Sequence, residues 1–513
     1  MAEQERTMSF LPFFSVETWI LLIAFICIFV IYGKSTHGIF EKLGIPGPKP
    51  YMYLGTAGRH HRVFYEDDKL SAQKYGRVWG IYEFKKPILA VMDPEMLKTI
   101  LVKDCFTYFT NRRNIRLNGD LYDAVSVVED DHWRRIRNIL TPFFTSGRLK
   151  EMFNIMKHHS SKLTASLQSK AHNNEVITVK NFFGPYSIDV LASCSFSVDV
   201  DSINNPSSPL VYHASKMFRF PVSVLLLQGF FPVLLPLFEL MGLSIFSRTS
   251  TAYFKTVLDK IRAERAKSSN QNFRDILQIM INSQTAKEPV KEKQNKGLTD
   301  HEILSQATIF LFAGYETSAT TLVFLAYNLA RNPEIMKRLQ EEIDCTFPNK
   351  GAVQYEDLVQ MEYLDSVVNE TLRLYPAAAR LERVAKETVK VGGITIPKDM
   401  IVMVPVYALH RDPELWPEPE EFKPDRFSKQ NKQSINPYTY LPFGVGPRNC
   451  MGMRFALVMI KLALVEVLQN YSFCVCGETE IPLTLDPIGL VGPLKPIRLK
   501  VVTRSITSGN VSN

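Results

Sequence analysis

The sequence predicts a mainly α-helical catalytic domain with small β-sheets, preceded by one N-terminal transmembrane helix. Three observations predict it: helical patterns dominate residues 131–340, strand-like pieces elsewhere are short, and residues 18–33 form a charge-free apolar run. A length of 513 residues would suggest about three domains at roughly 150 residues each. Because no repeat or long low-complexity linker divides the chain, one large domain is expected instead.

Composition limits the partners and the compartment. The chain is 46% hydrophobic and 22% charged, as a globular protein is, and its net charge of +8 is spread without a long basic run. This pattern disfavours nucleic acid and favours a basic face that docks an acidic protein. The seven cysteines are odd in number and scattered, which indicates a reducing compartment rather than a disulfide framework.

The apolar run at residues 18–33, together with residues 8–16, can cross a bilayer core of about 30 Å. A cleaved signal peptide is the alternative, but the preceding residues are acidic, Lys34 and Lys42 follow, and no small-x-small cleavage site is evident. We therefore expect an uncleaved anchor, with residues 1–17 in the lumen and the catalytic domain in the cytosol. The Pro- and Gly-rich residues 34–52 are expected to form a stiff spacer, residues 53–505 the catalytic domain and residues 506–513 a polar tail.

A second apolar region, residues 220–246, carries only one charge, Glu239, and is broken by three prolines. It is too interrupted to span a membrane. Core packing is one interpretation, and a surface that dips into lipid is the one we favour.

The remaining elements follow in chain order. Residues 77–82 and 87–91 alternate like a hairpin, and Asp93 with Pro94 begins a helix. Residues 287–297 are polar and are expected to be a mobile loop. Thr299 and Glu302 form a capping box for a nearly uncharged helix that ends near Arg331 and must be buried. Strands are expected at residues 389–396, 401–406 and 496–502.

Residues 443–452 read FGVGPRNCMG and place one cysteine, Cys450, in a glycine-rich loop directly before a helical run. N–H groups at the start of that helix would lower the pKa of the thiol, Phe443 would shield the sulfur, and Arg448 would pair with an anionic cofactor arm. An ordinary buried cysteine is the alternative. Zinc is disfavoured because the chain has no CxxC pair, and Cys474 and Cys476 on a probable strand do not supply one.

The loop resembles the haem-ligand loop F-G-x-G-x-R-x-C-x-G of the cytochrome P450 monooxygenases at every fixed position. The resemblance implies the cytochrome P450 fold, with Cys450 as the axial ligand of haem iron. Residues 313–318, AGYETS, resemble the oxygen-activation segment A-G-x-[DE]-T-[TS], which implies proton delivery by Thr317 and Glu316. Ala313 and Gly314 would then open the helix for the cofactor. Close helix packing, with Thr317 bonded to a carbonyl one turn earlier, is the alternative.

Other motifs carry the same resemblance. Glu370 and Arg373, with Arg426 in the F-x-P-x-R-F segment, are implied to form a buried triad that fixes the cysteine loop. The W-x-x-x-R helix implies that Trp133 and Arg137 bind the haem propionates, and Arg112, Arg383 and Arg448 occupy matching positions. Basic residues around the loop are expected to form a face for a reductase; they are Arg134, Arg135 and Lys461.

The similarity runs nearly end to end with family 3, the subfamily A type of drug- and steroid-oxidising enzymes. It implies a set of pocket residues, for which plain core packing is the alternative: Ser126, Phe218, Phe220, Ile309, Phe312, Ala313, Ala377, Ala378 and Leu490. The sequence departs from the family at pocket positions. Ala377 and Ala379 are smaller than expected, and residues 114–118 are more polar than the usual loop. Ala377 and Ala379 share one face of an extended segment and Ala378 the other, and which face meets the ligand stays open.

The resemblance implies an unspecific monooxygenase of the endoplasmic reticulum membrane that carries haem b. It would insert one atom of O₂ into lipophilic substrates, using NADPH indirectly through NADPH–cytochrome P450 reductase, with cytochrome b5 as an optional second partner. Two alternatives stay open. A haem-thiolate isomerase acting on peroxides would need no NADPH, and a non-catalytic haem sensor would need neither Glu316 and Thr317 nor a reductase face.

Overall fold

The computed structural model describes residues 15–56, 63–217, 222–267, 273–284, 297–487 and 489–504. Several sequence predictions therefore lie wholly or partly outside the described residues: the lumenal residues 1–14, the loop at 287–296, the pocket candidates Phe218 and Phe220, and the tail at 506–513.

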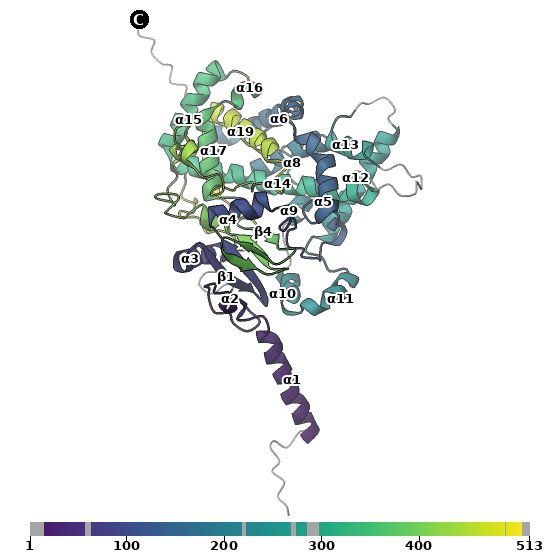
Figure 1. The fold of residues 1–513 in the computed structure, drawn as a ribbon. Helices are drawn as coiled ribbons and strands as arrows, with labels where there is room; N and C mark the ends of the chain where they lie inside the picture. The colour runs from purple at the N-terminus through teal and green to yellow at the C-terminus, as the bar shows by residue number, and fades with distance from the viewer. Residues whose placement is uncertain are drawn as a thin grey trace, which may run out of the picture.

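Helices make up most of the domain and surround one long central helix, α14 (Figure 1). Their bounds are α1 Val16–Lys34, α2 Ile39–Lys42, α3 Phe64–Tyr75, α4 Pro94–Lys98, α5 Asp130–Leu140, α6 Ser146–Ser166, α7 Gln168–His172, α8 Lys180–Phe196, α9 Pro209–Met217, α10 Val222–Phe230, α11 Leu235–Leu240, α12 Arg248–Lys267, α13 Ile276–Asn282, α14 Asp300–Arg331, α15 Pro333–Thr346, α16 Tyr355–Leu358, α17 Glu362–Leu374, α18 Val406–Leu409 and α19 Met453–Asn470.

The strands form three small sheets in the described part of the chain. Their bounds are β1 Val78–Glu83, β2 Lys86–Val91, β3 Val176–Thr178, β4 Leu381–Val384, β5 Val389–Val391, β6 Ile394–Ile396, β7 Ile401–Val404, β8 Tyr471–Cys474 and β9 Arg498–Thr503. The sheet orders are β1-β2-β7-β4, β3-β9-β8 and β5-β6. The hairpin β1–β2 is antiparallel, as predicted, with Val78 opposite Val91, whereas β2 and β7 run parallel.

Three strand predictions change in detail. The strand predicted at residues 401–406 ends at Val404, and Val406 begins α18. Residues 389–396 form a hairpin rather than one strand, because Gly392 and Gly393 both have positive φ, at 56° and 82°, and make the turn between β5 and β6. Cys476 lies beyond the end of β8, so it does not share a strand with Cys474.

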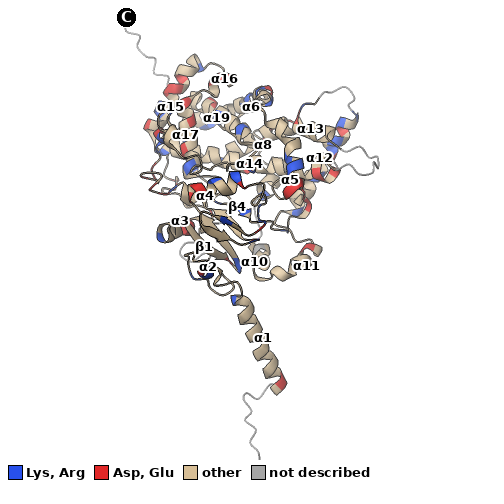
Figure 2. Ribbon diagram, in the orientation of Figure 1, with Lys and Arg blue, Asp and Glu red and all other residues tan. Residues whose placement is uncertain are grey.

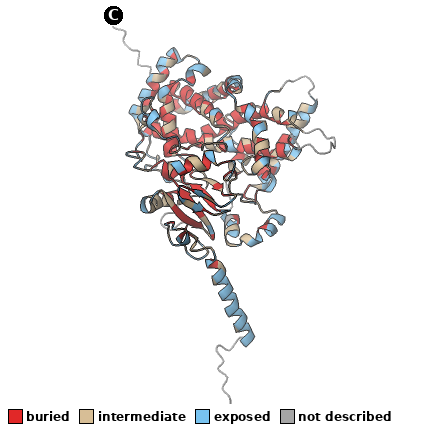
Figure 3. Cartoon of the chain, viewed as in Figure 1, coloured by how far each residue is buried: buried red, intermediate tan, exposed pale blue. Residues whose placement is uncertain are grey.

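Helix α14 begins and ends where the sequence predicts. The Thr299 hydroxyl accepts a hydrogen bond from the Glu302 N–H, and the Glu302 carboxylate accepts one from the Thr299 N–H, at 3.1 and 2.8 Å. These reciprocal bonds satisfy two donors that a helix start leaves without partners. The helix is long and apolar enough to cross a membrane, but 72% of its most apolar window is buried inside the domain. It is therefore the core helix, and it packs against α8, α17 and α19 (Figure 3).

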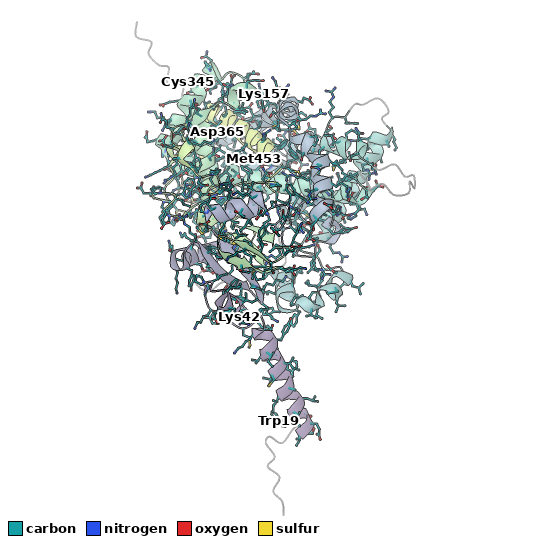
Figure 4. All side chains as sticks on the ribbon, viewed as in Figure 1. Trp19, Lys42, Lys157, Cys345, Asp365 and Met453 are labelled. Carbon is teal, nitrogen blue, oxygen red and sulfur yellow. The ribbon has the colours of Figure 1, made fainter. Side chains whose placement is uncertain are left out.

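Helix α1 stands apart from the domain, and nearly all of its side chains are exposed (Figures 1 and 3). Figure 4 shows Trp19 near its far end and Lys42 at the base of the domain. Only the two ends of α1 carry charge, with Glu17 in the first turn and Lys34 in the last (Figure 2). An exposed apolar helix of 19 residues matches the hydrocarbon thickness of a bilayer.

The Pro- and Gly-rich segment after α1 is attached to the sheet. The Gly80 N–H in β1 donates to the Pro46 carbonyl at 2.9 Å, and the Thr36 hydroxyl donates to the Lys85 carbonyl at 2.6 Å. A Cβ at Gly47 would lie 2.2 Å from the Gly80 carbonyl oxygen, so only glycine allows this contact. The segment therefore fixes the domain relative to the base of α1.

The second apolar region forms a flap, residues 222–245, which contains α10 and α11 at the same end of the domain as α1 (Figure 1). Leu235 and Phe238 face inward, whereas much of the outer side is apolar and exposed. The exposed residues include Val222, Leu226, Leu227, Phe231, Val233, Leu234, Leu237, Leu240 and Met241. A continuous exposed apolar face of this kind is typical of a surface that meets lipid or another apolar partner.

Candidate active site

The loop before α19, residues 443–452, is held by hydrogen bonds between its own backbone groups. The Cys450 N–H donates to the Phe443 carbonyl at 2.9 Å, and the Asn449 N–H donates to the Gly446 carbonyl at 3.1 Å. Gly446 has a φ of 76°, and a Cβ there would lie 2.1 Å from the Leu101 carbonyl oxygen, so no other residue fits. The loop ends at α19, whose first residue, Met453, lies within the helical body of the domain (Figure 4).

The Cys450 thiol lies in the interior of the domain, yet its side chain is accessible. Its side chain keeps a large accessible surface, yet burial raises the pKa of its thiol. Both hold if the sulfur faces an internal space rather than bulk water. The N–H groups of Gly452 and Met453 and the guanidinium groups of Arg112 and Arg137 act in the opposite direction on this pKa, but burial is the largest influence. The prediction that the helix start would give a low pKa is therefore wrong for the protein alone, and a bound metal ion would have to displace the proton.

Four arginines gather beside the Cys450 loop. Arg112 donates to the Arg448 carbonyl at 3.1 Å, and Arg137 donates to both the carbonyl and the side-chain oxygen of Asn449 at 2.7 Å. The Arg448 guanidinium lies 4.2 Å from the ring centre of Trp133 and donates to three backbone carbonyls. Arg383, on β4, is 3% exposed. In the described residues none of these four arginines forms an ion pair with a carboxylate.

This crowding of positive charge requires an anion. Burial and the neighbouring guanidinium groups lower the pKa of Arg448 to about 9, and burial with Arg112 lowers that of Arg383 to about 10. The buried Nε of Arg383 has no hydrogen-bond partner within the described part of the chain. Buried cations and donors without partners are costly. A flat cofactor with two carboxylates above the Cys450 thiol would satisfy them, so these residues fit the propionates of haem.

The middle of α14 opens on one side. Between Glu302 and Ala330, a stretch that is described throughout, Ala313 is the one exposed residue. Thr317, one turn later on the same face, donates its hydroxyl hydrogen to the Ala313 carbonyl at 2.7 Å. This is the hydrogen bond that close helix packing, the alternative to proton delivery, predicts for Thr317. It leaves the oxygen lone pairs of Thr317 free to accept a hydrogen bond.

Gly314 does not face that opening. A Cβ at Gly314 would lie 2.6 Å from a methyl carbon of Leu191 on α8, so the glycine allows two buried helices to approach closely. The expectation that Gly314 makes room for the cofactor is therefore corrected: its missing side chain makes room for α8.

Glu316 also points away from Thr317. Its carboxylate forms an ion pair with Lys180 at the start of α8 and accepts a hydrogen bond from the Thr320 hydroxyl. Any delivery of protons by Glu316 therefore requires its carboxylate to leave Lys180 first. The Lys180 side chain is 40% exposed, so solvent reaches this pair.

The predicted triad forms in the core. Arg373 binds Glu370 through two hydrogen bonds of 2.7 and 2.9 Å, and Arg426 approaches the same carboxylate at 3.3 Å. The side chains of Glu370 and Arg373 are completely buried. Arg373 also donates to the His410 carbonyl at 2.8 Å. The triad is thus attached to the residues that precede the Cys450 loop.

His410 connects the triad to the loop, and the sequence analysis missed it. Its Nδ1 donates to the Arg373 carbonyl at 3.2 Å, and its Nε2 accepts from the Leu441 N–H at 2.8 Å. Leu441 lies two residues before Phe443. No spacing in the sequence indicates this role, since the histidine acts only through contacts with distant residues.

The described pocket candidates differ in burial. Ile309 and Phe312 on α14 are buried, whereas Ser126, Ala377, Ala378 and Leu490 are half-buried. The Val491 N–H donates to the Ala377 carbonyl at 3.1 Å, so residues 377–378 and Leu490 lie side by side. Ala379 is buried, and its carbonyl accepts from the Tyr407 N–H at 3.1 Å.

Two of the three cations predicted for a docking face form ion pairs with carboxylates of the same domain. Lys461 is 6% exposed and paired with Asp365, and Arg135 binds the Glu302 carboxylate. Arg134 stays half-exposed beside Asp131. The exposed Arg454, in the first turn of α19, is a cation on this side that the sequence analysis did not select.

Comparison with known proteins agrees with this geometry. The family model described as Cytochrome P450 matches residues 45–501. The chain is 57% identical to cytochrome P450 3A27 of Oncorhynchus mykiss over 508 residues, which covers 98% of each chain. It is 56% identical to cytochrome P450 3A40 of Oryzias latipes, over 97% of this chain and 99% of the relative. It is 50% identical to cytochrome P450 3A9 of Rattus norvegicus, over 98% of this chain and 99% of the relative.

The connection through His410 predicts a pH dependence of stability. Burial and the Arg373 charge lower the pKa of His410 from 6.5 to about 3. Between these two values the unfolded chain binds a proton that the folded chain does not, so stability is lost as pH falls. The expected loss is about 1.4 kcal/mol for each pH unit. The total slope in urea unfolding between pH 6 and 4 includes other groups, such as His159, whose pKa burial also lowers. His410→Gln should reduce that total slope by this amount. The exposed His158→Gln is the control, and an equal slope in His410→Gln and the native chain would contradict the assignment.

Proposed function

The chain belongs to the cytochrome P450 family, and from this premise we propose that it oxidises lipophilic molecules such as steroids and drugs. As a haem-thiolate monooxygenase it carries haem b and uses NADPH indirectly. The observation that carries the proposal is the position of Cys450, an accessible thiol in the interior beside four arginines that pair with no carboxylate among the described residues.

Each residue of the site has a proposed role. Cys450 binds the iron, and Arg112, Arg137, Arg383 and Arg448 hold the two propionates, with Trp133 supporting Arg448. When bound, haem supplies the redox chemistry that splits O₂, which a thiolate ligand favours. The N–H groups of Gly452 and Met453 stabilise the negative charge of the sulfur. Phe443 would shield the sulfur from water, and the exposed Ala313 would leave space for the cofactor beside α14.

Thr317 is the proposed proton donor at the cavity. To donate, its hydroxyl hydrogen must leave the Ala313 carbonyl and turn toward the cavity, and its oxygen then takes up a replacement proton. Glu316 would resupply that proton from solvent after exchanging its bond to Lys180. The bond to Lys180 is also the observation that favours an isomerase, since such an enzyme needs no acid at the cavity. Product formation that does not depend on NADPH would support the isomerase.

Apolar residues support a lipophilic substrate. Ile309, Phe312, Ala377, Ala378 and Leu490 offer no charge to a ligand, so burial of apolar surface would supply most of the affinity. The exposed face of the flap and helix α1 lie at the same end of the domain (Figure 1). We propose that this end rests in the endoplasmic reticulum membrane, with the domain in the cytosol, and that substrates arrive from the lipid.

The proposed electron donor is NADPH–cytochrome P450 reductase, with cytochrome b5 as a second partner. The half-exposed Arg134 and the exposed Arg454 are cations near the Cys450 loop and suit an acidic partner.

The role of Cys450 predicts a spectroscopic result. The reduced carbon-monoxide complex of the native chain should show the red-shifted band of thiolate-ligated haem iron. Cys450→His should move that band to the position of histidine-ligated haem, because the sulfur is lost while a ligand remains. Cys474→Ala is the control and should leave the spectrum unchanged. A native-like spectrum in Cys450→His would exclude Cys450 as the ligand.

The role of Thr317 predicts a loss of coupling. Thr317→Ala should keep haem and bind substrate, while the fraction of NADPH that yields product falls sharply, because a positioned proton transfer typically contributes about 10²–10⁴-fold to a rate. Thr321→Ala, which removes the same kind of bond one turn later, should keep the native coupling. Equal coupling in Thr317→Ala and the native chain would show that the hydroxyl serves only helix packing.

A further inference from the structure

The polar segment at residues 114–119 is tied to the flap by three contacts. Gln228 on α10 donates to the Ile115 carbonyl at 2.7 Å. Arg116 binds the Glu239 carboxylate on α11 through two hydrogen bonds of 3.0 and 2.7 Å. The Ile245 N–H donates to the Leu117 carbonyl at 2.9 Å. These contacts close the seam between the flap and the segment.

The seam lies between the outer face of the flap and the candidate pocket. Phe246, directly after Ile245, packs its ring 5.7 Å from that of Phe312 on α14, the residue before the exposed Ala313. The chain that continues from the segment contributes Val125, whose carbonyl lies 3.4 Å from Arg448, and Ser126. An apolar molecule that leaves lipid at the flap therefore meets this seam before it reaches the Cys450 cavity.

The Arg116 contact is the one that can open most easily. The Arg116 side chain is 47% exposed and that of Glu239 36%, so water and salt compete with the ion pair. The other two contacts are hydrogen bonds to the backbone carbonyls of Ile115 and Leu117, and Leu117 is buried. The Arg116 N–H donates to the Asn114 side chain at 2.8 Å, and this bond within the segment does not involve Glu239.

We propose that the Arg116–Glu239 ion pair is a latch that limits how fast bulky lipophilic ligands pass the seam, and that it thereby selects ligands by size. The inference rests on the proposed function, because it takes the Cys450 cavity as the destination. Small ligands need no opening of the flap, so the latch acts on the rate for large ligands and leaves the rate for small ones unchanged.

Two ligands with the same iron-binding ring test this. Imidazole and 1-tritylimidazole, which adds a bulky apolar group, are mixed with the full-length haem-loaded protein in nanodiscs, and binding is followed by the haem absorption change. Arg116→Gln and Glu239→Gln should each raise the association rate of 1-tritylimidazole about two- to fivefold, the range for an exposed ion pair. The rate for imidazole should stay as in the native chain.

Further variants separate the latch from a general charge effect. The swap Arg116→Glu with Glu239→Arg should restore the native rate, and Arg148→Gln, which breaks the exposed pair with Glu151 on α6, should not change it. Added salt should raise the 1-tritylimidazole rate in the native chain and not in Arg116→Gln. An unchanged 1-tritylimidazole rate in both single variants, or an equal rise for both ligands, would overturn the latch. If imidazole gives no absorption change even in the native chain, the proposed function itself fails.

Discussion

The ion pair between Glu370 and Arg373 is the interaction on which the position of the candidate site depends. Both side chains are completely buried, and loss of one partner would leave a buried charge uncompensated, at a cost of about 3–5 kcal/mol. Arg373 uses its remaining donors on backbone carbonyls of His410, Pro419 and Glu421. His410 then holds Leu441, so one buried pair fixes the chain on the way to Cys450.

A second constraint is electrostatic. The arginines beside the Cys450 loop depress one another's pKa values, while burial raises the pKa of the thiol. The folded chain therefore holds cations that need an anion and a thiol that needs a metal ion to lose its proton. Haem b meets both requirements at once, which explains why the same short stretch of chain carries Arg448 and Cys450.

Local patterns in the sequence predicted much of this structure. The capping box at Thr299, the hairpin at β1–β2 and the helix after Cys450 are all encoded within a few neighbouring residues, and the structure contains them. The side-chain partners of Glu316, Lys461 and Arg116 were missed, because Lys180, Asp365 and Glu239 lie 136, 96 and 123 positions away. Gly314 shows the same limit. Its sequence context fits both an opening for the cofactor and close helix packing, and only the contact with Leu191 decides between them.

The central claim is that the buried pair positions the thiol, and Glu370→Gln tests it most directly. This substitution keeps the shape of the side chain and removes its charge, whereas Glu362→Gln changes an exposed residue at the start of the same helix and serves as the control. The measurement is the fraction of reduced haem whose carbon-monoxide band is at the thiolate position. The account predicts that Glu370→Gln loses most of this fraction while Glu362→Gln keeps it. A full thiolate band in Glu370→Gln, with native thermal stability, would contradict the account.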